Sequence, residues 1–103
     1  MTIAYIIVGG SGSYSDRVER PIAAFLDKQA AEALLGALER NAKEYRGRCR
    51  AFPVTMAWNA EPRVAAHERA KAQAAAYGAD LWEDYELVEC PFRDAASSPW
   101  IAR

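Results

Sequence analysis

The stretch Thr2-Ile3-Ala4-Tyr5-Ile6-Ile7-Val8, stopped by Gly9 and Gly10, decides the fold of this chain. It is rich in β-branched and aromatic residues and too short for a stable helix, which is typical of a strand. Because it is almost wholly apolar, we expect a central strand that is buried on both faces for part of its length.

A second strand is predicted at Val18 to Leu26, after a polar loop from Gly9 to Asp16. Pro21 cannot donate a hydrogen bond to a neighbouring strand, so this segment should be an edge strand or bend at that residue. The two strands form a hairpin with a long connection. A hairpin cannot bury one face alone, so later elements must cover it.

The next segment is predicted to be a helix that begins at Lys28, with Asp27 as its N-cap. Gly36 in mid-helix costs about 1 kcal/mol relative to alanine, so we expect it to mark a close approach to a neighbouring element. Gly47 is the expected C-cap. One face of the helix is apolar and should pack on the sheet; it comprises Ala31, Leu34, Leu35, Leu38, Ala42 and Tyr45.

Three further segments complete the pattern. Phe52 to Trp58 alternates at period two but contains Pro53, which fits either a short strand or an extended connector. Ala60 to Tyr77 is an alanine-rich, peripheral helix that ends at Gly78. Tyr85 to Phe92 alternates again and is the last strand.

This order predicts an α+β fold: a three-stranded antiparallel sheet, with the last strand beside the first and two helices packed on one face. The sheet has four strands if Phe52 to Trp58 adds one. Residues 1–92 form the single domain, and 93–103 form a loosely held tail. The uncovered sheet face should expose several apolar side chains and be covered by Trp100 and Ile101 of the tail or by a second copy of the chain in a homodimer. We expect that exposed set to come from Ile3, Tyr5, Ile7, Tyr85 and Leu87.

Size and composition set limits on function. The chain has 103 residues, 13 basic and 14 acidic side chains and a formal charge of -1, which argues against direct nucleic-acid binding driven by overall charge. The longest apolar stretch is too short to cross a membrane, and no basic segment precedes it as in a signal peptide. Cys49 and Cys90 are therefore expected to remain reduced thiols.

The glycine-rich run is the most unusual stretch. Backbone amides and hydroxyls of Gly10, Ser11, Gly12 and Ser13, together with Arg17, could cradle a small anion or a nucleotide. The run lacks the lysine of a P-loop and the spacing of a dinucleotide fingerprint. The alternative is a flexible hairpin connection.

No catalytic, cofactor or metal motif stands out. His67 is the only histidine, and a Cys–His nucleophile pair with Cys49 or Cys90 would have no orienting residue or cysteine signature. We therefore expect a non-enzymatic protein without cofactor or metal.

The distribution of charged residues and the three tryptophans indicate that the protein recognises a partner through its surface. Residues 40–50 are basic and residues 80–89 are acidic, which fits either a helix end and a solvated strand or two recognition patches of opposite sign. Trp58 and Trp82 are expected at the edge of the core. Trp100 lies in the tail and is a candidate binding anchor.

A resemblance adds to this interpretation. The motifs Tyr14-Ser15-Asp16, Phe25-Leu26-Asp27-Lys28 and Tyr85-Glu86-Leu87-Val88-Glu89-Cys90-Pro91 resemble those of small phage-encoded domains of unknown function. The resemblance covers the first third and the last strand, but not residues 49–78. It implies a phage or prophage origin, where small proteins often bind and block host machinery, as anti-CRISPR and other anti-defence inhibitors do.

The sequence thus predicts a protein-binding inhibitor that acts on a host protein or complex in the host cytoplasm. The alternative is an anion-binding or nucleotide-binding domain. The residues expected to contact the partner are Tyr14, Asp16, Arg17, Trp82, Glu83, Asp84, Glu86 and Trp100.

Overall fold

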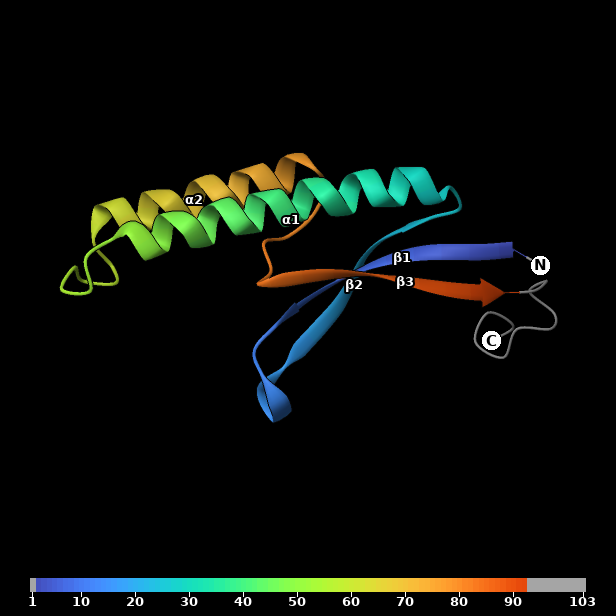
Figure 1. Cartoon of the computed structure of the whole chain (residues 1–103), viewed down its shortest axis with the longest axis horizontal. Helices are drawn as coiled ribbons and strands as arrows, with labels where there is room; N and C mark the ends of the chain where they lie inside the picture. The colour runs from blue at the N-terminus through green and yellow to red at the C-terminus, as the bar shows by residue number, and fades with distance from the viewer. Residues whose placement is uncertain (1, 93–103) are drawn as a thin grey trace.

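The computed structural model describes residues 2–92 and contains one sheet and two long helices (Figure 1). The side chains of Tyr14 and Phe92 fall outside this description. The predicted α+β fold with a three-stranded antiparallel sheet is confirmed. The elements are β1 (Thr2–Ser11), the 3-10 turn η1 (Tyr14–Asp16), β2 (Val18–Phe25), α1 (Lys28–Ala51), α2 (Glu61–Ala76) and β3 (Asp84–Phe92).

The sheet has the order β2-β1-β3, so the apolar first strand is central and the last strand lies beside it, as expected. Pro21 lies in edge strand β2. The pairing of β1 with β2 shifts register between Ile7 and Val8 of β1, and Ile22 is the extra, unpaired residue of β2 at this position. A bulge at this position accommodates a residue that cannot donate to the ladder. The polar loop begins later than expected, because Gly9 and Gly10 still belong to β1 and pair with residues of β2 and β3.

Helix α1 covers one face of the sheet and packs on it through the apolar face that the sequence predicts. Asp27 caps its first turn by accepting a hydrogen bond from the Gln29 amide at 3.0 Å. Leu38 is fully buried and belongs to the same core cluster as Ile7 of β1 and Tyr85 of β3. The helix therefore packs across the central strand and its neighbour β3.

The face of the sheet that we expected to be exposed is the buried one. Ile7 and Tyr85 lie in the core under α1, and Leu87 packs against them. Successive side chains of a strand alternate between faces, so the open face instead carries Ile6 and, directly across from it on β3, Val88. The register of a strand fixes which residues share a face, but periodicity alone does not say which set meets the helices. The predicted cover, residues 93–103 with Trp100 and Ile101, lies outside the described residues.

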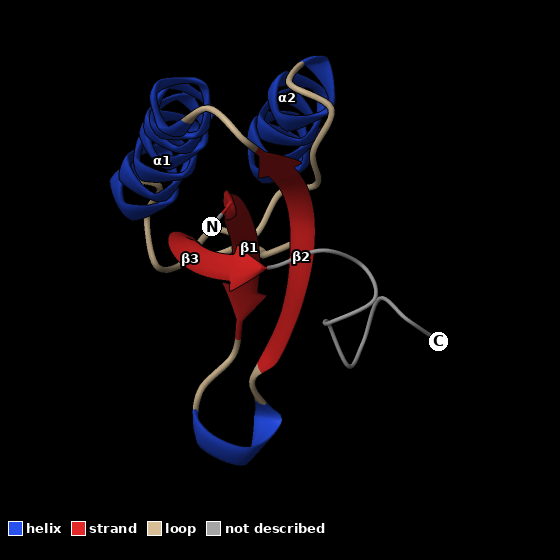
Figure 2. Cartoon of the chain, turned by 90° about the vertical axis from the view of Figure 1, so that its right-hand side faces the viewer, coloured by secondary structure: helices blue, strands red, loops and turns tan. Residues whose placement is uncertain are grey.

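Helix α2 packs on α1 rather than on the sheet, although both helices lie on the same side of it (Figure 2). The contact runs through small buried side chains of Ala66, Ala70 and Ala74. The Asn41 side chain donates across it to the Ala70 carbonyl at 3.0 Å. The end of α2 matches the prediction, since Gly78 adopts a positive φ of 76° just past the last turn.

Two expectations for glycines in α1 are wrong. Gly47 does not end the helix, which continues to Ala51 and is capped where the Phe52 amide donates to the Cys49 carbonyl. Gly36 does not mark a close approach of another element, since the nearest group to an added methyl would be Arg40 of the same helix, at 3.4 Å. Both residues are simply tolerated inside a helix that tertiary contacts stabilise.

The segment between the helices is neither a strand nor extended. Residues 52–60 form two consecutive turns, closed by hydrogen bonds from the Met56 amide to the Pro53 carbonyl and from the Ala60 amide to the Ala57 carbonyl, both at 3.0 Å. Pro53 starts the first turn and ends the apparent strand pattern. No fourth strand forms within residues 2–92.

The molecule is elongated, with extents of 57 × 30 × 17 Å. Figure 1 shows why: the C-terminal half of α1 and the N-terminal half of α2 extend beyond the sheet. We call residues 40–71 the hairpin end, after the helical hairpin of α1 and α2; it comprises the C-terminal half of α1, the connection and the first eleven residues of α2. The other end is formed by the sheet and the start of α1.

Replacing Leu38 with alanine should lower the free energy of unfolding by about 2–5 kcal/mol, because it empties a fully buried site between α1 and β1. Urea unfolding followed by circular dichroism measures the loss. Leu26→Ala is the matched control: that side chain is 69% exposed, so the expected change is below about 0.5 kcal/mol. Equal effects of the two substitutions would contradict the assigned core.

Candidate binding surfaces

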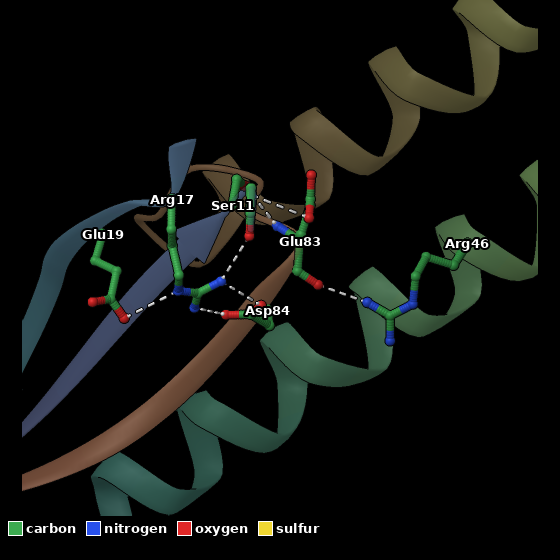
Figure 3. Close-up of polar contacts among 7 residues, drawn as sticks. Ser11, Arg17, Glu19, Arg46, Glu83 and Asp84 are labelled. Atoms are coloured by element: carbon green, nitrogen blue, oxygen red, sulfur yellow. Dashed lines mark hydrogen bonds and ion pairs between the residues drawn. The ribbon is translucent and has the colours of Figure 1, made fainter. Parts of the chain in front are cut away.

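Three of the predicted partner-binding residues meet where β3 begins. Arg17, which precedes β2, donates to both carboxylate oxygens of Asp84 on β3, at 2.6 and 3.1 Å, and pairs with Glu19 at 3.4 Å (Figure 3). The Glu83 carboxylate accepts from the Gly12 amide at 3.3 Å, and the Glu83 carbonyl accepts from Arg46 of α1 at 2.6 Å. These contacts tie the β1–β2 connection and α1 to β3.

This arrangement occupies two of the donors that the glycine-rich run and Arg17 were expected to offer to an anion. The Gly12 amide faces the Glu83 carboxylate, and the Arg17 guanidinium is bound to Asp84 and to the Gly12 carbonyl. The Ser11 hydroxyl accepts from the Glu83 amide at 3.1 Å. Internal carboxylates therefore already engage the Gly12 amide and the Arg17 guanidinium.

The glycines of the run have packing roles instead. A methyl group on Gly9 would lie 2.5 Å from Cδ1 of Trp82, and one on Gly10 would collide with the Arg17 guanidinium. Gly12 has a positive φ of 89°, which L side chains rarely adopt. Consecutive glycines are thus required because an indole packs on one face of β1 and a guanidinium packs on the other.

The other predicted residues that the structure describes, Asp16, Trp82 and Glu86, contribute no side chain to the polar contacts of this cluster. Trp82 is half-buried and packs against the core, so its expected place at the core edge is correct. Its backbone amide donates to the Tyr85 hydroxyl at 3.0 Å. Glu86 is exposed further along β3, and Asp16 is exposed in η1. Trp100 and the side chain of Tyr14 lie outside the described residues.

Most acids of residues 80–89 are already paired. Besides Asp84, Asp80 lies 3.8 Å from Arg20 and Glu89 lies 3.6 Å from Lys28. These exposed pairs contribute little to stability. They do reduce the negative field that the acidic segment was expected to present to a partner.

The Arg17–Asp84 pair changes the titration of both groups. The hydrogen bonds from Arg17 lower the pKa of Asp84 below its usual range, and the same contact raises the pKa of Arg17. The charged forms of both residues are therefore favoured in the folded state.

The hairpin end carries a surface that sequence reasoning missed. Trp58, expected at the core edge, is 85% exposed, Val54 is 99% exposed and Val64 on α2 is 46% exposed. Trp58 and Val54 each follow the first residue of one of the two turns, so both side chains lie at outer corners where no other element of residues 2–92 covers them. Pro53 and Asn59 were the available signals, since both favour turns over strands.

Arg63 holds this connection in place. Its Nη2 donates to the carbonyls of Pro53 and Met56, at 3.0 and 3.4 Å, and its guanidinium lies 5.3 Å from the centre of the Phe52 ring. One α2 side chain therefore fixes both ends of the first turn and packs on the residue before it. We call Val54, Trp58 and Val64 the apolar tip.

A cavity of about 330 Å³ opens beside the apolar tip and brings together Tyr45, Cys49, Trp58 and His67. The rings of Tyr45 and His67 lie 5.8 Å apart, and burial, with a contribution from the neighbouring Cys49, raises the pKa of the Tyr45 hydroxyl. Cys90 lies away from this cavity on β3. Of the two thiols, only Cys49 shares a cavity with the histidine, and no carboxylate among the lining residues orients the imidazole.

Comparisons with known proteins give no relative: no family model, no curated protein and no solved structure matches the chain. Within residues 2–92, no group of three or more His, Cys, Asp or Glu side chains could hold a metal ion. Neither helix in that part of the chain is both long and apolar enough to cross a membrane.

The close packing at Gly9 yields a prediction. Gly9→Ala should destabilise the fold by about 1–3 kcal/mol, because the new methyl group overlaps the Trp82 ring. Gly47→Ala is the control, since nothing lies within 4 Å of the added methyl and alanine favours the helix by about 0.5–1 kcal/mol. Thermal and urea unfolding should move in opposite directions for the two variants. A stabilised Gly9→Ala protein would show that Trp82 does not pack on β1.

The pH dependence of stability should reveal the Arg17–Asp84 pair. Because folding lowers the pKa of Asp84, the pair stabilises the protein above the unfolded-state value of about 3.9 and this contribution is lost as the pH falls through the folded-state pKa. Between about pH 5 and pH 2, wild type should therefore lose more unfolding free energy than Asp84→Asn. The difference should shrink in about 1 M NaCl, since the pair is exposed. Parallel pH profiles for the two proteins would contradict this assignment.

Proposed function

We propose that this chain is a non-enzymatic protein-binding module that contacts its partner through the apolar tip. The observation that carries the proposal is the exposure of Trp58 and Val54 at the outer corners of two turns that Arg63 holds in place. Single exposed apolar residues are common on proteins. Trp58 and Val64 also line an apolar cavity, and apolar surface gathered in this way is typical of interaction sites.

The geometry favours binding in two ways. Tryptophan is enriched among residues that dominate binding energy, because a large rigid ring buries much area at low entropic cost. The Arg63 contacts fix the turns before a partner arrives, so less conformational freedom is lost on association. An apolar side chain of the partner would enter the cavity between Trp58 and Tyr45.

The resemblance to phage-encoded domains supports a host protein as the partner. An inhibitor of a bacterial defence system such as CRISPR-Cas, acting by occluding a surface in the host cytoplasm, fits a small protein that offers a binding tip. Anion binding at Gly10 to Ser13 lacks such support, because the Gly12 amide and Arg17 already face carboxylates. Catalysis by Cys49 and His67 lacks an orienting group.

The double variant Val54→Ser/Trp58→Ala tests the proposal. Tagged wild-type protein should retain at least one host protein from a bacterial lysate that the variant fails to retain, as measured by quantitative mass spectrometry. Both substituted side chains are exposed, so the unfolding free energy should change by less than about 1 kcal/mol.

Val18→Ser is the matched control. Val18 is 59% exposed on β2, at the sheet end of the molecule, and its replacement should leave the set of retained proteins unchanged. Identical sets for wild type and for the tip variant would refute binding through the tip.

A further inference from the structure

Charge is strongly segregated along this elongated molecule. The hairpin end, residues 40–71, contains eight Lys and Arg residues against three Glu residues, a net charge of +5. The rest of the described chain, residues 2–39 and 72–92, contains three basic and ten acidic residues, a net charge of −7. The near-neutral total therefore hides a basic end that also carries the apolar tip.

The basic end contains a groove between α1 and α2. Two adjoining cavities, of about 230 and 470 Å³, share Arg48, Ala66 and Arg69, and Arg40 lines the first of them. The second cavity is lined by Phe52 and by Pro62, the residues that flank the connection bearing Val54 and Trp58. The groove thus runs along the two helices from Phe52 and Pro62, and the residues of the apolar tip do not line it.

The chemistry of the groove is mixed. Alanines from both helices line it, which lets a segment approach the helix backbones closely. Arg48 is bound to Glu44, but Arg40 and Arg69 form no ion pair with any side chain of residues 2–92. A ligand that fits must present apolar groups to the alanines and carboxylates to these two arginines.

A protein segment fits this surface better than a nucleic acid does. The groove has aromatic rings at Tyr45, Phe52 and Tyr77 but no continuous basic track, because the Glu44 carboxylate also lines it. Single-strand binding relies on aromatic stacking along such a track. A long polyanion that followed the groove would also approach the sheet end, which carries −7. A short acidic protein segment avoids that repulsion.

We propose that the groove formed by Arg40, Arg48 and Arg69 receives an acidic amphipathic helix of the protein partner. This inference rests on the proposed function and adds the chemistry of the segment that is recognised. Apolar side chains of the helix lie on the alanines, and its Asp or Glu residues pair with Arg40 and Arg69.

A displayed library of random peptides of about 16 residues, or about 24 Å as a helix, provides the probe. Peptides selected on the full-length protein should carry an excess of Asp and Glu at helical spacing with apolar residues. They should bind Arg40→Glu/Arg69→Glu about tenfold or more weakly, and their affinity for wild type should fall as ionic strength rises.

The control reverses the same number of charges at the other end. Arg20→Glu/Lys28→Glu should keep wild-type affinity, because both residues are exposed and pair with carboxylates near the sheet. If the double glutamate variant does not fold, as judged by circular dichroism, Arg40→Gln/Arg69→Gln replaces it with an expected loss in the same direction.

Several results would overturn the inference. These are selection of no peptide, selection of peptides without acidic excess, unchanged affinity after charge reversal, or tighter binding of a fluorescent (dT)20 oligonucleotide than of the peptides at equal salt. Its failure is distinguishable from failure of the proposed function. If wild type retains a host protein through Trp58 and the Arg40→Glu/Arg69→Glu variant retains the same protein equally well, the proposed function stands. Only the proposal of an acidic helix is then rejected.

Discussion

The structure depends on the burial of one helix face, that of α1, against a sheet of only three strands. Leu38 and Ile7 are fully buried where the helix crosses β1, and Tyr85 and Leu87 complete the contact from β3. A helix of 24 residues is about 36 Å long. Figure 1 shows that α1 runs along β1 and β3 and that its C-terminal half extends beyond the end of the sheet, where it needs another partner.

Helix α2 is that partner, and its composition follows from the geometry. Ala66, Ala70 and Ala74 let it lie close to α1, but small side chains bury little area, so the pair gains less from the hydrophobic effect than the sheet contact does. Polar contacts supplement it: Asn41 reaches the Ala70 carbonyl, and Arg63 fixes the turns that join the helices. The hairpin end is held together by a thin interface and specific hydrogen bonds.

Sequence patterns predicted the elements better than their faces. Period-two alternation identified β3, Asp27 identified the start of α1, and Pro21 identified an edge strand with an irregularity. Which face of β1 meets α1 could not be derived, because both sets of alternate residues are apolar. The prediction that Trp58 lies at the core edge is wrong for a related reason. Phe52 to Trp58 alternates like a strand, and only its hydrogen bonds show two turns that expose the indole.

Arg17, Glu83 and Asp84 were predicted to form a partner-binding surface. In the structure, Arg17 pairs with Asp84, and Glu83 accepts from the Gly12 amide, each across more than 60 residues of sequence.

The division of the molecule into two ends has a physical consequence for recognition. Like charges at the hairpin end repel one another, and the fold tolerates this because α1 is anchored by apolar contacts at the sheet. Along a molecule 57 Å long, the two ends are separated by far more than the Debye length of about 8 Å at physiological salt. Each end therefore presents its own field to an approaching partner, and the near-neutral total does not describe either. A partner with acidic groups would be oriented toward the hairpin end before contact, so that apolar contacts at Trp58 form after electrostatic attraction has selected the end.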